Sequence, residues 1–275
     1  MKKQNACEGL MRALTWGAAV ITVGVLVFLV GFILVRGIPY LKPSLFSPTY
    51  NSENVSLMPA LISTVLMTLL SLIIAVPLGV FAAIYLAEYA GRGSRAVSLI
   101  RITTETLSGI PSIVYGLFGL LFFVTYLGWG FSLLAGAFTL SIMTLPLIIR
   151  SSEEALRAVP DTYREGALGL GAGKLRTTFQ IVLPSAMPGI FAGVILAIGR
   201  IVGETAALIY TAGTVAQVPA NPMMSARTLS VHLYALSSEG LHMGEGYATA
   251  VVLLVVVLLI NTLSAWAAKR MGARG

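Results

Sequence analysis

The sequence predicts an all-α membrane protein with six transmembrane helices, on three observations. Hydrophobic residues make up 57% of its 275 residues and charged residues only 11%, whereas a soluble domain carries about 25% charged residues. Six apolar segments are each long enough to cross about 30 Å of hydrocarbon. Lys and Arg concentrate in alternate connecting segments, as expected of a chain that crosses a membrane repeatedly.

The six apolar segments are the predicted spans. They cover residues 14–35, 59–86, 110–127, 131–149, 188–212 and 248–267. The first is longer than the apolar region of a signal peptide, and no small-residue cleavage site follows it. We therefore expect one transmembrane domain over residues 1–275, with a core of about 59–268 and the first span as an added N-terminal helix.

The positive residues predict the direction of the chain. If both termini are cytoplasmic, the cytoplasmic segments hold 14 of the 18 Lys and Arg residues and the outer segments hold three. The remaining one, Arg200, lies inside a span. Because positive residues stay on the cytoplasmic side, we expect a long cytoplasmic loop at 150–186 and a long outer loop at 213–247.

The outer loop contains one predicted helix. Leu229, Leu233 and Leu236 recur at helical spacing, which indicates a short amphipathic helix that lies on the membrane, under a partner or against its own bundle. His232 and His242 have no cysteine or carboxylate at metal-ligand spacing. We interpret them as surface histidines and expect no metal site.

The cytoplasmic loop predicts a helix, a sharp corner and a second helix. Pro160 ends the preceding helix, and Thr162 with Glu165 forms a capping box that starts the next one. Gly171 permits the left-handed conformation that ends this helix. A second helix then runs onward from Lys174.

The glycine-rich part of this loop is not a nucleotide site. A Walker A sequence needs Gly five residues before its Gly-Lys pair and Ser or Thr after it, whereas these positions hold Leu168 and Leu175. The net charge of +7 is not arranged as a basic stripe interleaved with aromatics, so a nucleic-acid partner is excluded. We expect no cofactor, no enzymatic activity and no ATP bound by this chain.

The same loop resembles the EAA loop of bacterial ABC importer permeases, whose pattern is E-A-A-x3-G-x9-I-x-L-P. The matching residues are Glu165, Gly166, Ala167, Gly171, Ile181, Leu183 and Pro184. Gly166 replaces the first alanine of the pattern, which weakens the helix by about 1 kcal/mol. The resemblance implies the type I ABC importer permease fold and a coupling helix that sits in a cleft of a cytoplasmic ATPase, where the ATP binds.

Two other segments are similar to the phosphate-specific, PstA-type permeases of this family. They are Leu-Ser-Gly-Ile-Pro-Ser-Ile-Val-Tyr-Gly-Leu at 107–117 and Gly-Arg-Ile-Val-Gly-Glu-Thr at 199–205. The resemblance implies ATP-driven import of inorganic phosphate across the bacterial inner membrane. It also implies as partners a PstC-type permease, two PstB-type ATPase subunits and a periplasmic PstS-type phosphate-binding protein.

Arg200 and Glu204 are the charged residues of the fifth span. Each costs about 2.5–3.5 kcal/mol at the centre of a bilayer, and at i and i+4 they share a helix face and can pair. A guanidinium binds two oxygens of an oxyanion at once. We therefore interpret Arg200 as the phosphate site and Glu204 as the residue that orients and neutralises it; the alternative is a structural pair.

Four further residues are candidates for the substrate path. Ser108, Ser112 and Thr205 carry hydroxyls that either donate to phosphate oxygens or bond their own helices. Arg150, at the inner end of the fourth span, either contacts the substrate or anchors the span by its positive charge.

Two other functions remain open at this stage. A permease of the same architecture for sulfate or molybdate is one, because arginine binds any tetrahedral oxyanion similarly. The other is a secondary transporter or assembly scaffold without an ATPase, which is expected to show repeat symmetry and broken helices at the membrane midplane. The docking loop argues against this second possibility.

Overall fold

The computed structural model describes residues 2–91 and 95–272, and its regular elements in these ranges are helices. In chain order they are α1 (Lys2–Gly37), η1 (Ile38–Tyr40), η2 (Pro43–Phe46), α2 (Met58–Ile84), η3 (Tyr85–Tyr89), α3 (Arg95–Ser108), α4 (Ser112–Gly119), η4 (Leu120–Tyr126), α5 (Leu133–Ala158), α6 (Asp161–Gly169), α7 (Lys174–Thr177), η5 (Thr178–Val182), α8 (Leu183–Val202), α9 (Ala206–Thr211), α10 (Leu229–Glu239) and α11 (Met243–Gly272). The elements η3, η4 and η5 are π-helical turns.

Five helical segments in the described residues are long and apolar enough to cross a membrane. They are Met11–Tyr40, Met58–Tyr89, Leu133–Ala158, Lys174–Val202 and Met243–Trp266. A sixth crossing is formed when the bent pair Val97–Ser108 and Ser112–Tyr126 is counted as one span. On that count the predicted all-α fold with six spans is confirmed.

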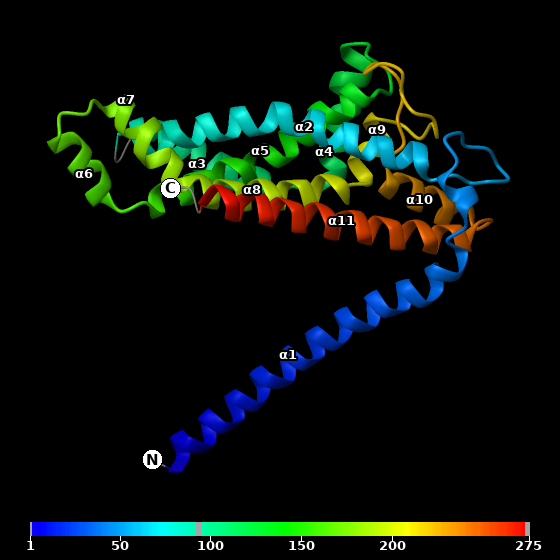
Figure 1. Cartoon of the computed structure of the whole chain (residues 1–275), viewed down its shortest axis with the longest axis horizontal. Coiled ribbons are helices and arrows are strands. Elements are labelled where there is room, and N and C mark those ends of the chain that lie inside the picture. Colours follow the sequence, from blue (N-terminus) through cyan, green and yellow to red (C-terminus); the bar gives the residue numbers. More distant parts are fainter. Residues whose placement is uncertain (1, 92–94, 273–275) are drawn as a thin grey trace.

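The helices α2, α5 and α8 form the centre of the bundle, with α5 packed along both of the others. A Cβ atom added at Gly79 of α2 would lie 2.6 Å from Cγ2 of Ile148 on α5, so glycine allows these helices to approach closely. The buried Ser141 hydroxyl of α5 donates a hydrogen bond to the carbonyl of Ser71 on α2 at 3.0 Å. Figure 1 shows α6 and α7 at one end of this bundle and α10 at the other; these are called the α6 end and the α10 end.

The first helix lies outside the bundle. Figure 1 shows α1 diverging from α11 toward the N-terminus. The two helices meet near Gly37, where an added Cβ atom would lie 2.8 Å from the carbonyl carbon of Tyr247. The large apolar side chains of α1 from Met11 to Phe28 are exposed, which suits a helix surrounded by hydrocarbon.

The predicted helix of the outer loop is α10, and it packs on its own bundle. Leu229 and Leu236 are fully buried, and α10 contacts α11 and α2. His232 is fully buried as well, so its assignment as a surface histidine is wrong. The spacing of the leucines identified the buried face. His232 also belongs to that face, because Tyr50 and Val55 of the loop between η2 and α2 lie against it.

The fifth span is broken, contrary to the continuous helix predicted over 188–212. The rod formed by α7, η5 and α8 ends at Val202, and α9 begins at Ala206. Gly203 is the C-cap residue of α8, and its backbone N–H bonds the carbonyls of Gly199 and Ile201. The third span follows a second break, where the Gly109-Ile110-Pro111 segment bends the chain by 100° between α3 and α4.

The two helices that follow these breaks pack against each other. A Cβ atom added at Gly116 of α4 would lie 2.8 Å from the Cα of Ala207 on α9. Both residues are buried, and their chain neighbours Tyr115 and Leu208 belong to one hydrophobic cluster with Ile201. Glycine at position 116 therefore sets how closely the two broken spans approach.

Gly116→Ala is expected to lower the melting temperature of the purified protein. The new methyl group would press on a backbone atom that cannot rotate away, and overpacking of this kind costs about 1–3 kcal/mol. Gly24→Ala in α1 is the matched control, because nothing lies within 4 Å of a Cβ atom there. Equal melting temperatures for the two variants would contradict the close packing of α4 on α9.

Candidate functional site

The break in the fifth span gives Glu204 a different role from the one predicted. Its Oε1 accepts a hydrogen bond from the backbone N–H of Ala207 at 3.0 Å, and the residue is 8% exposed. A carboxylate at a helix N-terminus satisfies a free N–H and interacts favourably with the helix dipole. Glu204 thus caps α9. The predicted pair with Arg200 is not formed, because α8 ends at Val202 before the chain reaches Glu204.

Arg200 lies in the last turn of α8, just before this break, and is half-buried. Among the described residues, no carboxylate forms an ion pair with its guanidinium. It lies close enough to Tyr115 of α4 for its charge to act on that hydroxyl group. The guanidinium is permanently charged, so Arg200 presents a positive charge that the described part of the chain does not neutralise.

The surroundings of Arg200 are formed by the two breaks. Tyr115 donates a hydrogen bond to the carbonyl of Leu107 at 2.8 Å, which joins α4 to the end of α3. The helices α4 and α9 meet at Gly116 and Ala207. Helix N-termini carry partial positive charge, and broken membrane helices use such ends to receive anionic groups.

The three hydroxyl candidates differ in their positions. Ser112 is the first residue of α4, and Thr205 directly precedes α9. Both are half-buried, and neither side chain is hydrogen-bonded within the described residues. The Ser108 hydroxyl donates to the carbonyl of Glu105 at 2.8 Å, so it bonds its own helix.

The contacts of Arg150 are with other residues than those around Arg200. Its Nε lies 3.0 Å from Oε1 of Glu154, and both side chains are more than 60% exposed. It lines a cavity of about 230 Å³ together with Arg101, Glu105 and other residues near the α6 end. The ion pair and exposure favour an anchoring role.

Charges at the α6 end are paired in the same way. Oε1 of Glu153 on α5 lies 2.8 Å from Nη2 of Arg101 on α3 and 2.9 Å from Nη2 of Arg157. The Glu153 side chain is only 11% exposed. This carboxylate therefore holds α3 against α5 and forms ion pairs with two arginines, whereas Arg200 has no such partner in the described chain.

The α10 end is tied directly to the break in the fifth span. The Ser230 hydroxyl of α10 donates to the carbonyl of Glu204 at 2.7 Å. The backbone N–H of Leu229 donates to Oγ1 of Thr64 on α2 at 2.9 Å. Ser230 could not be singled out from the sequence, because it lies 26 residues from Glu204 and one serine in a loop carries no pattern.

The loop at 150–186 has the predicted helix, corner and helix. α5 ends at Ala158, before Pro160; α6 follows; and Gly171 has a φ of +82° at the corner. The predicted capping box is wrong. α6 begins at Asp161, so Thr162 already lies inside the helix, and Pro160 occupies the cap position without a side-chain hydrogen bond.

The residues of the EAA pattern are distributed over both parts of this loop. Glu165 and Gly166 are exposed on α6, and Ala167 is buried. Ile181 and Leu183 are half-buried at the start of the long rod, followed by the exposed Pro184. Glu165 and Gly166 are thus free to contact another molecule. Leu183 packs against a buried cluster of the bundle that includes Leu156 and Val182.

The corner also exposes apolar side chains. Leu170 is 91% exposed, Leu168 is 53% exposed and Tyr163 is 52% exposed. An exposed apolar patch of this kind marks a protein or membrane contact. Together with the exposed acidic Glu165, it gives the loop a surface suited to a protein partner.

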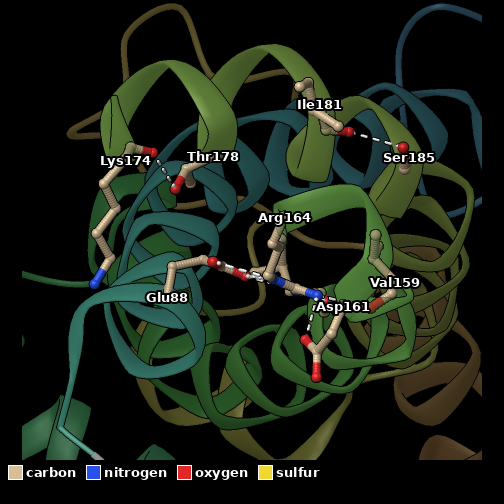
Figure 2. Close-up of polar contacts among 9 residues, drawn as sticks. Glu88, Val159, Asp161, Arg164, Lys174, Thr178, Ile181 and Ser185 are labelled. Atoms are coloured by element: carbon tan, nitrogen blue, oxygen red, sulfur yellow. Dashed lines mark hydrogen bonds and ion pairs between the residues drawn. The ribbon is translucent and has the colours of Figure 1, made fainter. Parts of the chain in front are cut away.

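Arg164 is a central residue of this loop that the sequence did not identify. It reaches from α6 to Glu88 on η3, with Nη2 2.7 Å from Oε1 of Glu88 (Figure 2). Its other hydrogen bonds go to the carbonyl of Val159 at 2.7 Å and the carbonyl of Leu156 at 2.8 Å, and to Oδ1 of Asp161 at 3.1 Å. The hydrogen bonds that Arg164 donates to Glu88 raise the pKa of Arg164 above its ordinary value, whereas burial acts to lower it.

The second half of the loop contacts the same π-helical turn. Nζ of Lys174 lies 5.1 Å from the centre of the Tyr89 ring, a distance typical of a cation–π interaction. Glu88 and Tyr89 therefore contact α6 and α7 respectively. The turn η3 at the end of the second span therefore contacts both helices of the loop at 150–186.

Comparison with known proteins assigns the chain to a family. Residues 75–274 match the family described as "Binding-protein-dependent transport system inner membrane component". The chain is 34% identical over 268 residues to the "Probable ABC transporter permease protein YqgI" of Bacillus subtilis, with 90% of each chain covered. It is also 34% identical over 273 residues to "Phosphate transport system permease protein PstA 2" of Mycobacterium bovis, covering 95% of this chain and 90% of that protein.

The fold agrees with this assignment. A bacterial alginate ABC transporter, crystallised in complex with an alginate-bound periplasmic protein, matches with a TM-score of 0.66 and 16% identity over 96% of this chain and 97% of that chain. The chain is therefore a multi-pass inner-membrane permease with the type I ABC importer fold. It belongs to the binding-protein-dependent permease family and, within it, to the PstA-type members.

Protonation of His232 is expected to destabilise the α10 end. Burial, with a smaller contribution from Arg227, lowers the pKa of His232 to about 4 from an ordinary value of 6.5. The folded protein binds fewer protons than the unfolded chain between these values, so its free energy of unfolding decreases as the pH falls from about 6.5 to about 4. The full loss is about 3 kcal/mol.

Melting temperatures of wild type and His232→Gln at about pH 7 and about pH 5 test this expectation. The decrease on acidification should be smaller in His232→Gln, while His242→Gln, at a partly exposed position, should behave like wild type. An equal decrease in all three proteins would contradict the assignment of the titrating group to His232.

Proposed function

We propose that this chain is one of two membrane-spanning permease subunits of an ATP-driven importer of inorganic phosphate, and that Arg200 binds the anion during transport. The observation that carries the site is the guanidinium of Arg200, which lies at a break in the fifth span without an ion-pair partner in the described chain. A permanent charge inside a membrane protein requires compensation. A transported phosphate dianion supplies it.

The neighbouring groups suit a tetrahedral oxyanion. A guanidinium donates two parallel hydrogen bonds to two oxygens of such an anion, and the hydroxyls of Ser112 and Thr205 add further donors at the two breaks. The N-terminus of α4 contributes partial positive charge. In this arrangement Glu204 fixes the start of α9 and does not neutralise Arg200 itself.

The broken spans also bear on the alternative functions. Broken helices were expected of a secondary transporter, but they occur here in a chain whose family consists of binding-protein-dependent permeases. The relative from Mycobacterium bovis is named as a phosphate transport system permease, which favours phosphate over sulfate or molybdate. Stimulation of ATP hydrolysis in the reconstituted complex by phosphate, and not by sulfate or molybdate, is the test of this substrate.

The chain supplies the docking surface and not the ATPase site. In the proposed complex, the coupling loop at 150–186 contacts a PstB-type ATPase through Glu165, Gly166 and the exposed corner at Gly171. A PstC-type permease forms the other half of the path, and a PstS-type protein delivers phosphate to the periplasmic loop at 213–247. The core is residues 59–268, with the first span added and both termini cytoplasmic.

Arg200→Gln is expected to reduce phosphate uptake by tenfold or more while the complex still assembles. The loss of hydrogen bonds to a charged ligand is worth about 1.5–3 kcal/mol. Uptake of labelled phosphate in cells that lack other phosphate carriers measures the effect. Arg150→Gln is the comparison, since Arg150 is exposed and paired with Glu154, and should retain most of the uptake.

Glu204→Gln should be milder than Arg200→Gln, because the amide oxygen of Gln can still accept the hydrogen bond that caps α9. If Arg200→Gln transported phosphate at the wild-type rate, the assignment of Arg200 to the anion path would be abandoned. The assignment of the chain as a permease subunit would not depend on that result.

Single cysteines test the proposed orientation in a Cys7→Ser background. Cysteines replacing Ser52 and Ser238, both exposed at or near the α10 end, should react with an impermeant thiol reagent added to intact cells. A cysteine replacing the exposed Thr162 on α6 should react only after the cells are permeabilised, because the positive loops stay inside. Labelling of Thr162→Cys in intact cells would reverse the orientation.

A further inference from the structure

The pair formed by Arg164 and Glu88 joins the docking helix to the second span. The two residues lie 76 positions apart, on α6 and on η3, the π-helical turn that continues α2. Nη2 of Arg164 lies 2.7 Å from Oε1 of Glu88, and Nε lies 3.2 Å from the same oxygen. Figure 2 shows the two side chains reaching toward each other across the space between the helices.

The environment of the pair makes it difficult to break. The side chain of Arg164 is 19% exposed and that of Glu88 is 8% exposed. Separating a buried pair leaves a charge without a partner in a poorly solvated place, which is strongly unfavourable. A displacement of α6 is therefore more easily accommodated by a movement of η3 with it than by separation of the two charges.

Arg164 also has a second set of contacts that is independent of Glu88. Its Nη1 and Nη2 donate to the carbonyls of Val159 and Leu156, which belong to the C-cap and the last turn of α5. These bonds hold α6 against the end of α5. Removal of Glu88 therefore leaves α6 attached to the bundle and breaks its connection to the second span.

The second span continues from this end to the Arg200 region. Met67 of α2 belongs to the same buried cluster as Tyr115 of α4, Ile201 of α8 and Leu208 of α9. Thr64, one turn earlier, accepts the hydrogen bond from Leu229 of α10. A movement applied at η3 thus acts on the helix that contacts both broken spans.

We propose that Arg164 is a positioning residue that transmits movements of the docking helix α6 to the second span through Glu88. The inference rests on the proposed docking of an ATPase at α6. It assigns two separate tasks to one side chain, since the carbonyl bonds place α6 and the Glu88 bonds connect it to α2. Loss of the connection should leave ATP hydrolysis intact and reduce the transport that accompanies it.

Glu88→Ala in the complete transport complex, reconstituted with its ATPase and binding protein, tests the inference. Copurification of the ATPase, phosphate-stimulated ATP hydrolysis and phosphate uptake are measured on the same preparation. Asp161→Asn is the matched control, because Asp161 also contacts Arg164 but lies on the same helix and is 69% exposed. Arg164→Lys is a third variant, in which one ammonium group replaces the fork that bonds Glu88 and the two carbonyls.

The expected result is a normal amount of copurified ATPase in Glu88→Ala and a ratio of uptake to hydrolysis lowered at least about fivefold, the lower end of the usual range for coupling between sites. Arg164→Lys should lower the same ratio, and Asp161→Asn should leave it unchanged. An unchanged ratio in Glu88→Ala, or loss of the ATPase from that complex, would overturn the inference. If the wild-type complex showed no phosphate uptake linked to hydrolysis, the proposed function itself would fail.

Discussion

The need to compensate buried charge organises this structure more than any other constraint. A charged side chain inside a membrane protein is expensive unless it is paired or hydrogen-bonded. Glu153 holds two arginines at the α6 end, Glu88 holds Arg164, and Glu204 accepts the N–H of Ala207. Each of these three carboxylates fixes the position of one element against another.

Arg200 differs from these groups because it has no ion-pair partner among the described residues. Its i+4 neighbour is the carboxylate that could have neutralised it, yet the helix ends between the two residues, and Glu204 is used as a cap. The same local event therefore frees the arginine and creates a new helix N-terminus beside it. A break at Gly203 accomplishes both because glycine ends α8 just before a residue able to cap α9.

Much of the fold was predictable because it depends on local composition. The length of the apolar segments predicted the spans, Pro160 predicted the end of α5, Gly171 predicted the corner after α6, and the leucines at 229–236 predicted α10. The break at Gly203 was missed because hydropathy continues across it. Glycine in an apolar run is compatible with either a continuous or a broken membrane helix.

The missed parts of the site depend on contacts between residues distant in sequence. Glu88 and Arg164 are 76 residues apart, and Ser230 is 26 residues from the carbonyl that it bonds. His232 is buried by a loop whose course no periodicity describes. The capping box failed for a local reason: Thr162 and Glu165 have the right spacing, but the cap position is Pro160, two residues before Thr162.

The stability of α6 follows from these same contacts. It has nine residues, fewer than the roughly 12–15 that an isolated helix needs in water. It lacks a side-chain cap, and Gly166 lowers its intrinsic stability by about 1 kcal/mol relative to alanine. No neighbouring atom requires glycine there, since nothing lies within 4 Å of an added Cβ. The geometry of α6 must therefore come from its surroundings, and Arg164 supplies bonds to two other elements from the middle of the helix. A helix held by such bonds takes its position from the ends of α2 and α5, so the position of α6 depends on the arrangement of the two spans to which it is attached.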